Sequence, residues 1–220
     1  MSAADLLTSY IPNGIMDWKL INNREETAMD NKELLLQCAK ELFYAKGYDA
    51  VGVQEIVDRA GLTKPTLYYY FGSKLGILET LLKIKLEQYR KITADVLKPE
   101  YGIQETLYKI AGLYCDFFEQ DRKFYMLMMS FVYFARENEA YQAVHPLVTE
   151  FFSMVVQSFE HAAPQLGNMR GRQRQFAIGF VGALNNYFLV HCEEDPENQK
   201  KISKRDMDEL VNQFMYGIFS

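Results

Sequence analysis

The sequence contains little cysteine and little proline, and these shortages exclude several classes of protein. The cysteines are Cys38, Cys115 and Cys192, an odd number with no CxxC pair, which is not the pattern of a disulfide framework or a zinc ribbon. We expect buried free thiols and a reducing compartment. The 6 prolines and 13 glycines are too few for a linker-rich or fibrous protein.

Export and membrane signals are also missing. Residues 1–10 lack the basic and apolar regions of a secretory signal. The longest apolar stretch runs from Phe124 to Ala135 and is too short to span a bilayer. The sequence therefore predicts a soluble cytoplasmic protein without a membrane segment.

The sequence has none of the common enzyme motifs. It contains no Gly-rich phosphate loop, no HExxH and no GxSxG. Its histidines, His145, His161 and His191, are widely separated, so we expect no metal site and no cofactor. We predict that the protein is not an enzyme. A cofactor-free enzyme stays the competing class, because buried acids leave no pattern in a sequence.

What the sequence does have is helical periodicity over most of its 220 residues, of which 49% are hydrophobic. Asp30 and Glu33 form a capping pair at the start of the first clear helix, and Gly47 ends it. Pro99 ends the fourth helix. No segment alternates polar and apolar residues for long enough to indicate a sheet, so the sequence predicts an all-α fold. We expect helices at about 30–46, 54–60, 64–71, 74–97, 103–119, 122–137, 139–162, 169–192 and 203–219.

We divide the chain into three parts. Residues 1–29 form an acidic N-terminal extension that contains the single tryptophan, Trp18. Its apolar content predicts short helical pieces that pack on the body of the protein. Residues 30–76 form a DNA-binding domain, for the reasons given next, and residues 77–220 form an effector-binding and dimerisation domain.

Two short helices joined by a glycine turn predict a helix-turn-helix motif, whose second helix enters the major groove of DNA. Ile56, Ala60, Leu62 and Leu67 have the spacing needed to pack the two helices together. The remaining side of the second helix carries hydroxyl groups and a lysine, which suit phosphate oxygens and base edges. These exposed candidates are Thr63, Lys64, Thr66, Tyr68, Tyr69 and Tyr70. The alternative is a core strip, but four consecutive aromatic residues cannot all face inward on a helix.

The formal net charge of −5 does not argue against DNA binding. Residues 59–91 contain seven lysines and arginines against two glutamates, so this part of the chain is basic. Only the face that meets the phosphates has to be basic.

The segment from Asn31 to Leu82, with the run AGLTKPTLYYYFGSK at its centre, resembles the TetR-type transcriptional regulators. The resemblance implies that Leu67 and Phe71 are core residues. It also implies a homodimer and a small effector bound in a C-terminal helical bundle. Its DNA-contacting positions correspond here to Thr63, Lys64, Thr66, Tyr68, Tyr69, Tyr70 and Lys74.

The sequence departs from the family pattern at three places. Gly52-Val53 stands where a Thr or Ser usually begins the second helix. Tyr70 stands where His or Arg is common. Gly76 follows Lys74-Leu75 where the family usually has Lys-Glu, and a glycine in a helix costs about 1 kcal/mol relative to alanine.

The second half of the chain carries more large apolar residues than one helix face can hold. One face makes the bundle core, and we expect a second to line a pocket for a small apolar effector, which can be aromatic or lipid-like. The alternative is that every one of these residues belongs to the core. The candidate ligand-binding residues are Tyr114, Phe117, Phe118, Tyr125, Met128, Met129, Phe131, Phe152 and Asn185.

The last two predicted helices are apolar on two faces, which indicates a dimer interface. The candidate residues are Phe176, Phe180, Ala183, Tyr187, Leu210 and Phe214. The sequence as a whole therefore predicts a homodimeric repressor that a small apolar effector releases from a palindromic double-stranded DNA operator. The alternative is a dimeric small-molecule-binding protein of the same fold with weak or lost DNA binding.

Overall fold

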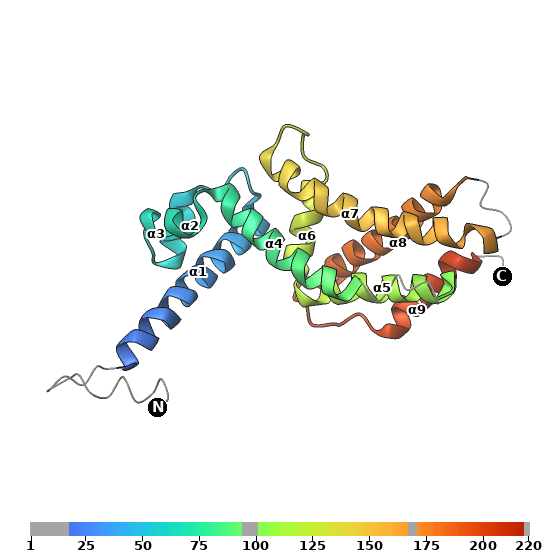
Figure 1. Ribbon diagram of the computed structural model, residues 1–220, viewed down its shortest axis with the longest axis horizontal. Helices are drawn as coiled ribbons and strands as arrows, with labels where there is room; N and C mark the ends of the chain where they lie inside the picture. Colours follow the sequence, from blue (N-terminus) through green and yellow to red (C-terminus); the bar gives the residue numbers. More distant parts are fainter. Residues whose placement is uncertain (1–17, 94–100, 167–170, 218–220) are drawn as a thin grey trace, which may run out of the picture.

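The computed structural model describes residues 18–93, 101–166 and 171–217, and every regular element in these ranges is helical. The all-α prediction is confirmed. Figure 1 shows helices α1–α3 at one end and α5–α9 at the other, with α4 running between them. The elements in order are α1 (Trp18–Lys46), α2 (Val53–Ala60), α3 (Lys64–Phe71), α4 (Lys74–Thr93), α5 (Ile103–Gln120), α6 (Arg122–Phe131), α7 (Glu139–Ala162), the short 3-10 helix η1 (Ala163–Gln165), α8 (Gln173–Glu194) and α9 (Lys204–Tyr216).

Helix α1 begins earlier than the sequence pattern predicts. It runs without interruption from Trp18, so Asp30 lies inside the helix and does not cap its start. No proline or glycine occurs between Trp18 and Lys46, and nothing in this segment ends a helix. The predicted packed pieces before Trp18 lie outside the described residues.

Helices α1–α3 enclose a small core made of fully buried side chains, among them Ala39, Phe43, Ile56 and Leu67. Glycines form the two helix ends that the sequence predicted. Gly47 and Gly61 have φ angles of 83° and 65°, in the left-handed region that glycine adopts without strain.

Helix α4 starts at a tight junction with α3, and Gly76 is required there. The Ser73 hydroxyl accepts a hydrogen bond from the Gly76 amide at 2.9 Å. A Cβ atom at position 76 would lie 1.9 Å from the carbonyl oxygen of Phe71. The departure from the family pattern at this position therefore has a steric reason, since only glycine allows the two backbones to approach so closely.

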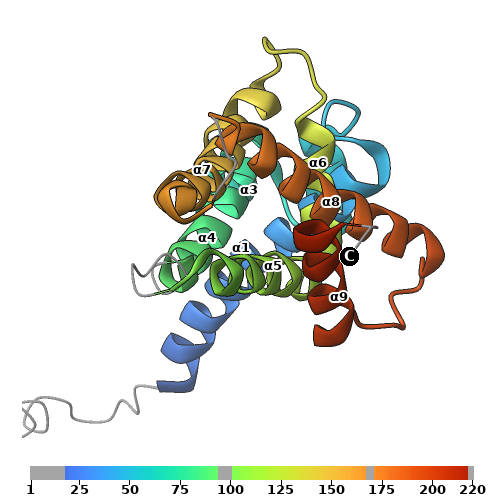
Figure 2. The ribbon, with the colours of Figure 1, turned by 90° about the vertical axis from the view of Figure 1, so that its right-hand side faces the viewer.

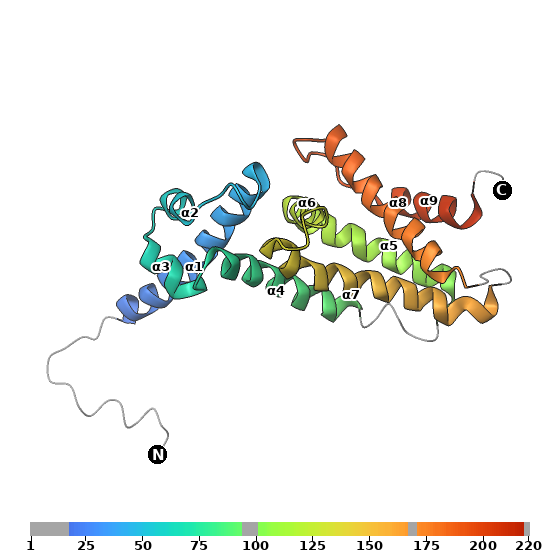
Figure 3. The same ribbon diagram turned by 90° about the horizontal axis from the view of Figure 1, so that it is seen from above.

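Helices α5–α9 pack into a bundle. Figure 2 and Figure 3 show α9 beside α5, and α7 alongside both α4 and α8. Large aromatic rings fill the interior, and Phe118 of α5 stacks on Phe188 of α8 with ring centroids 4.7 Å apart. Because α4 contacts α7 and α5 as well as α1 and α3, it links the two parts of the chain.

Helix α6 ends at Phe131, six residues before the predicted end. The amides of Val132, Tyr133 and Phe134 donate to carbonyls three residues back, which tightens and closes the helix. The Asn138 side chain then accepts from the amide of Ala140 at 2.8 Å and caps α7. No glycine or proline marks this reversal, which is why the sequence pattern did not predict it.

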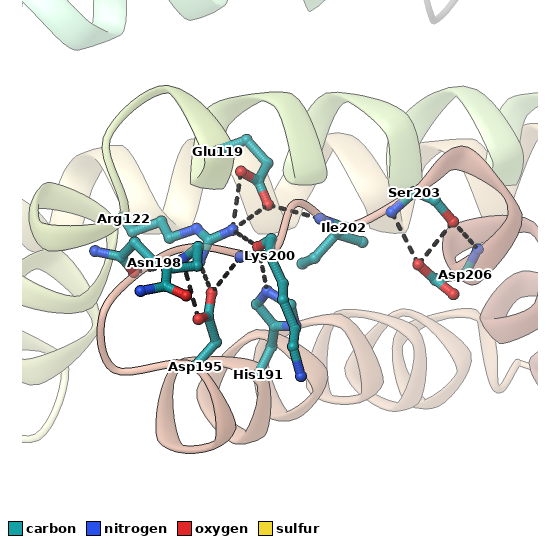
Figure 4. A network of polar contacts seen from close by, with 10 residues as sticks. Glu119, Arg122, His191, Asp195, Asn198, Lys200, Ile202, Ser203 and Asp206 are labelled. Atoms are coloured by element: carbon teal, nitrogen blue, oxygen red, sulfur yellow. Dashed lines mark hydrogen bonds and ion pairs between the residues drawn. The ribbon is translucent and has the colours of Figure 1, made fainter.

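A network around the buried Arg122 fixes the segment between α8 and α9, residues 195–203, onto the end of α5 (Figure 4). The guanidinium pairs with Glu119 at 2.8 Å and with Asp195 at 3.1 Å. It also donates to the backbone carbonyl of Lys200. Glu119 accepts in turn from the amide of Ile202 at 3.0 Å. The charges of Arg122, Glu119 and Asp195 are each paired in this network, and these contacts hold the segment on α5.

No helix in the described ranges is long and apolar enough to cross a membrane. The cysteines are free, with Cys38 and Cys115 buried and Cys192 half-buried. The described residues contain no group of three or more His, Cys, Asp and Glu side chains that could hold a metal ion.

Candidate DNA-binding and ligand-binding sites

Helix α3 has one buried and one exposed side. Leu67 is fully buried and Phe71 is buried, so these two side chains fix the helix on the core. On the opposite side Tyr69 is 83% exposed and Tyr68 is 47% exposed, and Thr63 and Lys64 are also exposed. Hydroxyl and ammonium groups on an exposed helix are the donors that phosphate oxygens and base edges accept.

Thr63, Thr66 and Tyr70 also support the local structure. Thr63 caps α3, because its hydroxyl accepts from the Thr66 amide at 3.4 Å, and the two hydroxyl oxygens are 2.9 Å apart. Thr66 and Tyr70 are half-buried. The ring of Tyr70 lies edge-on to Tyr69 at 5.1 Å, which supports the exposed ring of Tyr69.

Lys74 is bonded within the chain, whereas Lys64 forms no hydrogen bond or ion pair with the described residues. Its ammonium group donates to the backbone carbonyl of Tyr48 at 2.9 Å and lies 4.1 Å from the centroid of the Tyr48 ring. Lys74 is half-buried as a result. The resemblance placed Lys74 among the DNA-contacting residues, and the structure directs its charge into the junction between the two parts of the chain.

Tyr48 is the centre of that junction. It is fully buried, and its hydroxyl donates to a carboxylate oxygen of Glu139 at 2.5 Å. Its ring meets Phe131 edge-on at 6.0 Å. Burial, followed by the hydrogen bond to Glu139, raises the pKa of Tyr48 well above its usual value. Tyr48 therefore connects α1 and α4 to the end of α6 and the start of α7.

A second link between the two parts is made by Asp121. Its carboxylate caps α6 by accepting from the Phe124 amide at 3.1 Å. The same carboxylate pairs with Lys40 of α1 at 2.7 Å and lies 3.8 Å from Lys85 of α4. Burial lowers the pKa of Lys85, and the charge of Asp121 opposes this shift. The start of α6 is thus tied to both α1 and α4.

An apolar pocket of about 140 Å³ lies between α5, α6, α7 and α8. Seven of the nine predicted ligand-binding residues line it. The lining residues are Tyr114, Phe117, Tyr125, Met128, Met129, Val148, Phe151, Phe152, Val181 and Asn185.

Two predicted pocket residues lie elsewhere. Phe118 is fully buried in the core against Phe188. Phe131 is fully buried beside Tyr48 and lines a neighbouring groove instead of this pocket. Phe118 and Phe131 are therefore core residues, as expected from the alternative interpretation of the large apolar side chains.

The pocket contains few polar atoms, and one of them has no hydrogen-bond partner among the described residues. The Tyr125 hydroxyl donates to Asn185 at 2.6 Å. The Tyr114 side chain is buried, and its hydroxyl makes no hydrogen bond within the described part of the chain. Burial raises the pKa of Tyr114 above its usual value. A buried donor without an acceptor costs about 1–3 kcal/mol, so a polar ligand atom bound here would stabilise the site.

The predicted dimer residues are only partly accessible. Phe180 is 1% exposed and packs on Phe214 with ring centroids 5.0 Å apart, so it is not on the surface where a partner chain could contact it. Phe176, Ala183, Tyr187, Leu210 and Phe214 are half-buried.

The exposed apolar side chains of α8 lie at other positions. Ile178 is 54% exposed, and Leu189 and Val190 are also exposed. With Gly182 between them they follow helical spacing. The sequence pattern identifies α8 as rich in apolar residues but does not distinguish this exposed face from the one that packs inside the chain.

Comparisons with known proteins agree with this architecture. Residues 35–81 match the family model described as bacterial regulatory proteins, tetR family. The chain is 29% identical over 186 residues to the HTH-type transcriptional activator FasR of Mycolicibacterium smegmatis, which covers 83% of this chain and 80% of that protein. A stretch of 78 residues is 36% identical to the HTH-type transcriptional repressor BdcR of Escherichia coli, which covers 36% of this chain and 40% of that protein.

Solved structures share the fold over most of the chain. A putative fatty acid metabolism regulator of Clostridium perfringens has a TM-score of 0.71 at 22% identity, over 85% of this chain and 99% of that one. The regulator FadR of Bacillus subtilis, solved with stearoyl-CoA, has a TM-score of 0.67 at 16% identity, over 84% of this chain and 98% of that one.

Proposed function

Because the chain belongs to the TetR family of bacterial transcriptional regulators, we propose that it is a repressor that an apolar effector releases from its operator. The observation that carries the proposal is the exposed side of α3. Tyr69, Tyr68 and Lys64 extend outward while Leu67 and Phe71 hold the helix in place. Nothing in the core requires these exposed side chains, and they suit phosphate and base contacts.

We propose Thr63, Lys64, Thr66, Tyr68, Tyr69 and Tyr70 as the DNA contacts. Lys74 reaches DNA only if it leaves Tyr48, so we assign it to the junction in this conformation. The resemblance to BdcR, a repressor by name, favours repression, whereas FasR is named an activator. The sign of control is therefore part of the test below.

The proposed effector occupies the pocket between α5 and α8. Its walls are almost entirely aromatic, methionine and valine side chains, which suit an apolar ligand. The hydroxyl of Tyr114, which makes no hydrogen bond to the described residues, suits a ligand that also carries a polar atom. Since FadR of Bacillus subtilis was solved with stearoyl-CoA, we propose an acyl-bearing molecule as the effector class.

A homodimer completes the proposed regulator. The exposed Ile178, Leu189 and Val190 of α8 make an apolar surface suited to a second copy of the chain. Two copies would place two α3 helices on half-sites about one DNA turn apart, which explains how short helices read a palindrome.

Effector binding acts on DNA binding through the junction around Tyr48. Phe131 lies at the end of α6, whose residues Met128 and Met129 line the pocket, and it contacts Tyr48. A ligand that shifts α6 would change these contacts and, through Lys74, the position of α4. Such coupling requires the effector to bind the two states with different affinities.

The test is binding of the purified protein to the DNA flanking its own gene, titrated at several salt concentrations beside a random duplex. Tight, salt-dependent binding to one palindrome that the variant Lys64→Ala/Tyr69→Ala loses supports the proposal. Reporter expression from that DNA with and without the protein gives the sign of control. Binding no tighter than to random duplex favours the alternative, a ligand-binding dimer without operator binding.

A further inference from the structure

An open groove of about 410 Å³ lies next to the apolar pocket. The end of α6, one side of α7 and the start of α8 line it. Val148 and Phe152 of α7 line both the groove and the pocket, so the two spaces share a wall. Phe152 and Val148 are therefore the boundary that one elongated ligand would pass to occupy both spaces.

The groove differs from the pocket in its chemistry. Tyr141, His145 and Arg174 line it, whereas the pocket has no charged side chain among its lining residues. The rings of Tyr141 and His145 lie 5.0 Å apart and form one side. The guanidinium of Arg174 lies 5.1 Å from the centroid of the Phe152 ring, which places a positive charge at the shared wall.

Arg174 has no anionic partner in the described part of the chain. It lies over the face of Phe152, and within the described residues it forms no hydrogen bond or ion pair. By contrast, Arg90, Arg122 and Arg205 are each paired with a carboxylate. A guanidinium stacked on a ring keeps its N–H groups available for a planar anion.

The charges at the start of α8 also favour a bound anion. Its first turn contains no acidic residue. The N-terminus of a helix carries a partial positive charge, which adds to the charge of Arg174 beside the groove. Together with the groove and the unpaired Arg174, this arrangement favours a bound anionic group.

We propose that this groove binds the anionic head group of an amphipathic acid, through Arg174, while the apolar part of the same molecule occupies the pocket beyond Phe152. The inference rests on the proposed function, because it specifies the effector of the same site. The buried Tyr114 hydroxyl serves a polar atom further along the molecule, and the carboxylate or phosphate of the head pairs with the guanidinium in two parallel hydrogen bonds.

Calorimetric titration of the purified full chain tests the proposal with three ligands that share one alkyl chain: decanoate, decyl phosphate and decanol. We expect at least one of the two acids to bind tenfold or more tightly than decanol. In Arg174→Gln this preference should fall to less than twofold, with the affinity for decanol unchanged. The tighter of the two acids identifies the head group.

Arg172→Gln is the matched control. Arg172 is two residues away and also lies over an aromatic ring, Phe176 at 5.5 Å, but it does not line the groove. It should retain the full preference for the acid. The head-group site is wrong if acid and alcohol bind the native chain equally, or if Arg174→Gln keeps the preference for the acid. Either result would still be compatible with an apolar ligand in the pocket. If none of the three ligands binds, both the proposed apolar effector and the proposed head-group site are wrong.

Discussion

The hydroxyl of Tyr48 lies 2.5 Å from a carboxylate oxygen of Glu139, and this contact joins residues that are 91 positions apart in the sequence. Tyr48 belongs to the turn after α1, and Glu139 is the first residue of α7. The same tyrosine holds Lys74 through its carbonyl group and its ring. One side chain therefore touches the start of α4 and the start of α7 together.

Replacing Tyr48 with phenylalanine should keep the ring contacts and remove the hydrogen bond. A hydrogen bond to a charged group contributes about 1.5–3 kcal/mol, so urea unfolding should show a loss of free energy of unfolding in that range. The exposed Tyr44 offers a control, since Tyr44→Phe removes a hydroxyl at a position that is 45% exposed. A loss of the same size in both variants would contradict a special role for Tyr48.

Replacing Gly76 with alanine should destabilise the protein, because the new Cβ atom would collide with the Phe71 carbonyl. Forcing an atom into an occupied space costs about 1–3 kcal/mol. At Gly112, in the middle of α5, a Cβ atom would meet nothing within 4 Å. Gly112→Ala should stabilise the protein by about 0.5–1 kcal/mol, because alanine favours the helix. The two changes, measured by thermal unfolding, should have opposite signs.

Acid should weaken the network around Asp195. Hydrogen bonds from the amides of Lys200 and Gln199, together with Arg122, hold the pKa of this carboxyl below its usual range. A depressed pKa contributes stability above the unfolded value near about 4, and the contribution is lost as the pH falls through the folded value. Asp195→Asn should therefore be less stable than the native chain at pH 7, and the difference should narrow below about pH 4.

Urea midpoints at pH 7, 5 and 3.5 measure that difference. Asp116→Asn, at an exposed position of α5, controls for the loss of one negative charge. A gap between Asp195→Asn and the native chain that stays constant down to pH 3.5 would show that the charge of Asp195 is not what holds the segment 195–203.

Replacing Lys64 with alanine should reduce the salt dependence of operator binding. Each phosphate contact that a lysine makes changes the slope of log K against log salt by about 0.9. Lys204, an exposed lysine of α9 paired with Asp208, is the control, and Lys204→Ala should leave the slope unchanged. An unchanged slope in Lys64→Ala would remove Lys64 from the proposed phosphate contacts.

Replacing Ile178 with glutamate should separate the proposed dimer, because a buried unpaired charge at an interface is strongly unfavourable. Sedimentation should then give a monomer, and operator binding should fall with it. Tyr133, which is 85% exposed in the turn after α6, provides the matched change to glutamate. A dimer that persists in Ile178→Glu would place the interface elsewhere.

Local signals in the sequence were enough to predict α2 and α3. The Gly61 turn, the Thr63 cap and the apolar spacing of Leu67 and Phe71 all act over a few residues, and the structure contains each of them. The apolar pocket was predicted as a group of residues for a similar reason. When a helix carries more large apolar side chains than one face can hold, the additional side chains lie either in the core or around a cavity.

Relationships between distant residues could not be predicted in this way. Nothing near Lys74 in the sequence indicates that its partner is Tyr48, and nothing near Phe180 indicates that Phe214 covers it. Both depend on how the helices pack. The sequence does not mark Arg174 as a ligand-binding residue, because its role depends on its position over the Phe152 ring at the wall that the pocket and the groove share.

Asp121 and Arg122 are neighbours in the sequence, but their ion pairs reach different parts of the chain. Asp121 is paired with Lys40 of α1, and Arg122 is paired with Asp195 at the end of α8. The first turn of α6 is therefore tied both to α1, which packs with α3, and to the end of α8, whose exposed face suits a second copy of the chain. In the proposed dimer, this turn would lie on the path of contacts between α3 and the exposed face of α8, so substitutions at these two adjacent positions should change how the two α3 helices are held relative to each other.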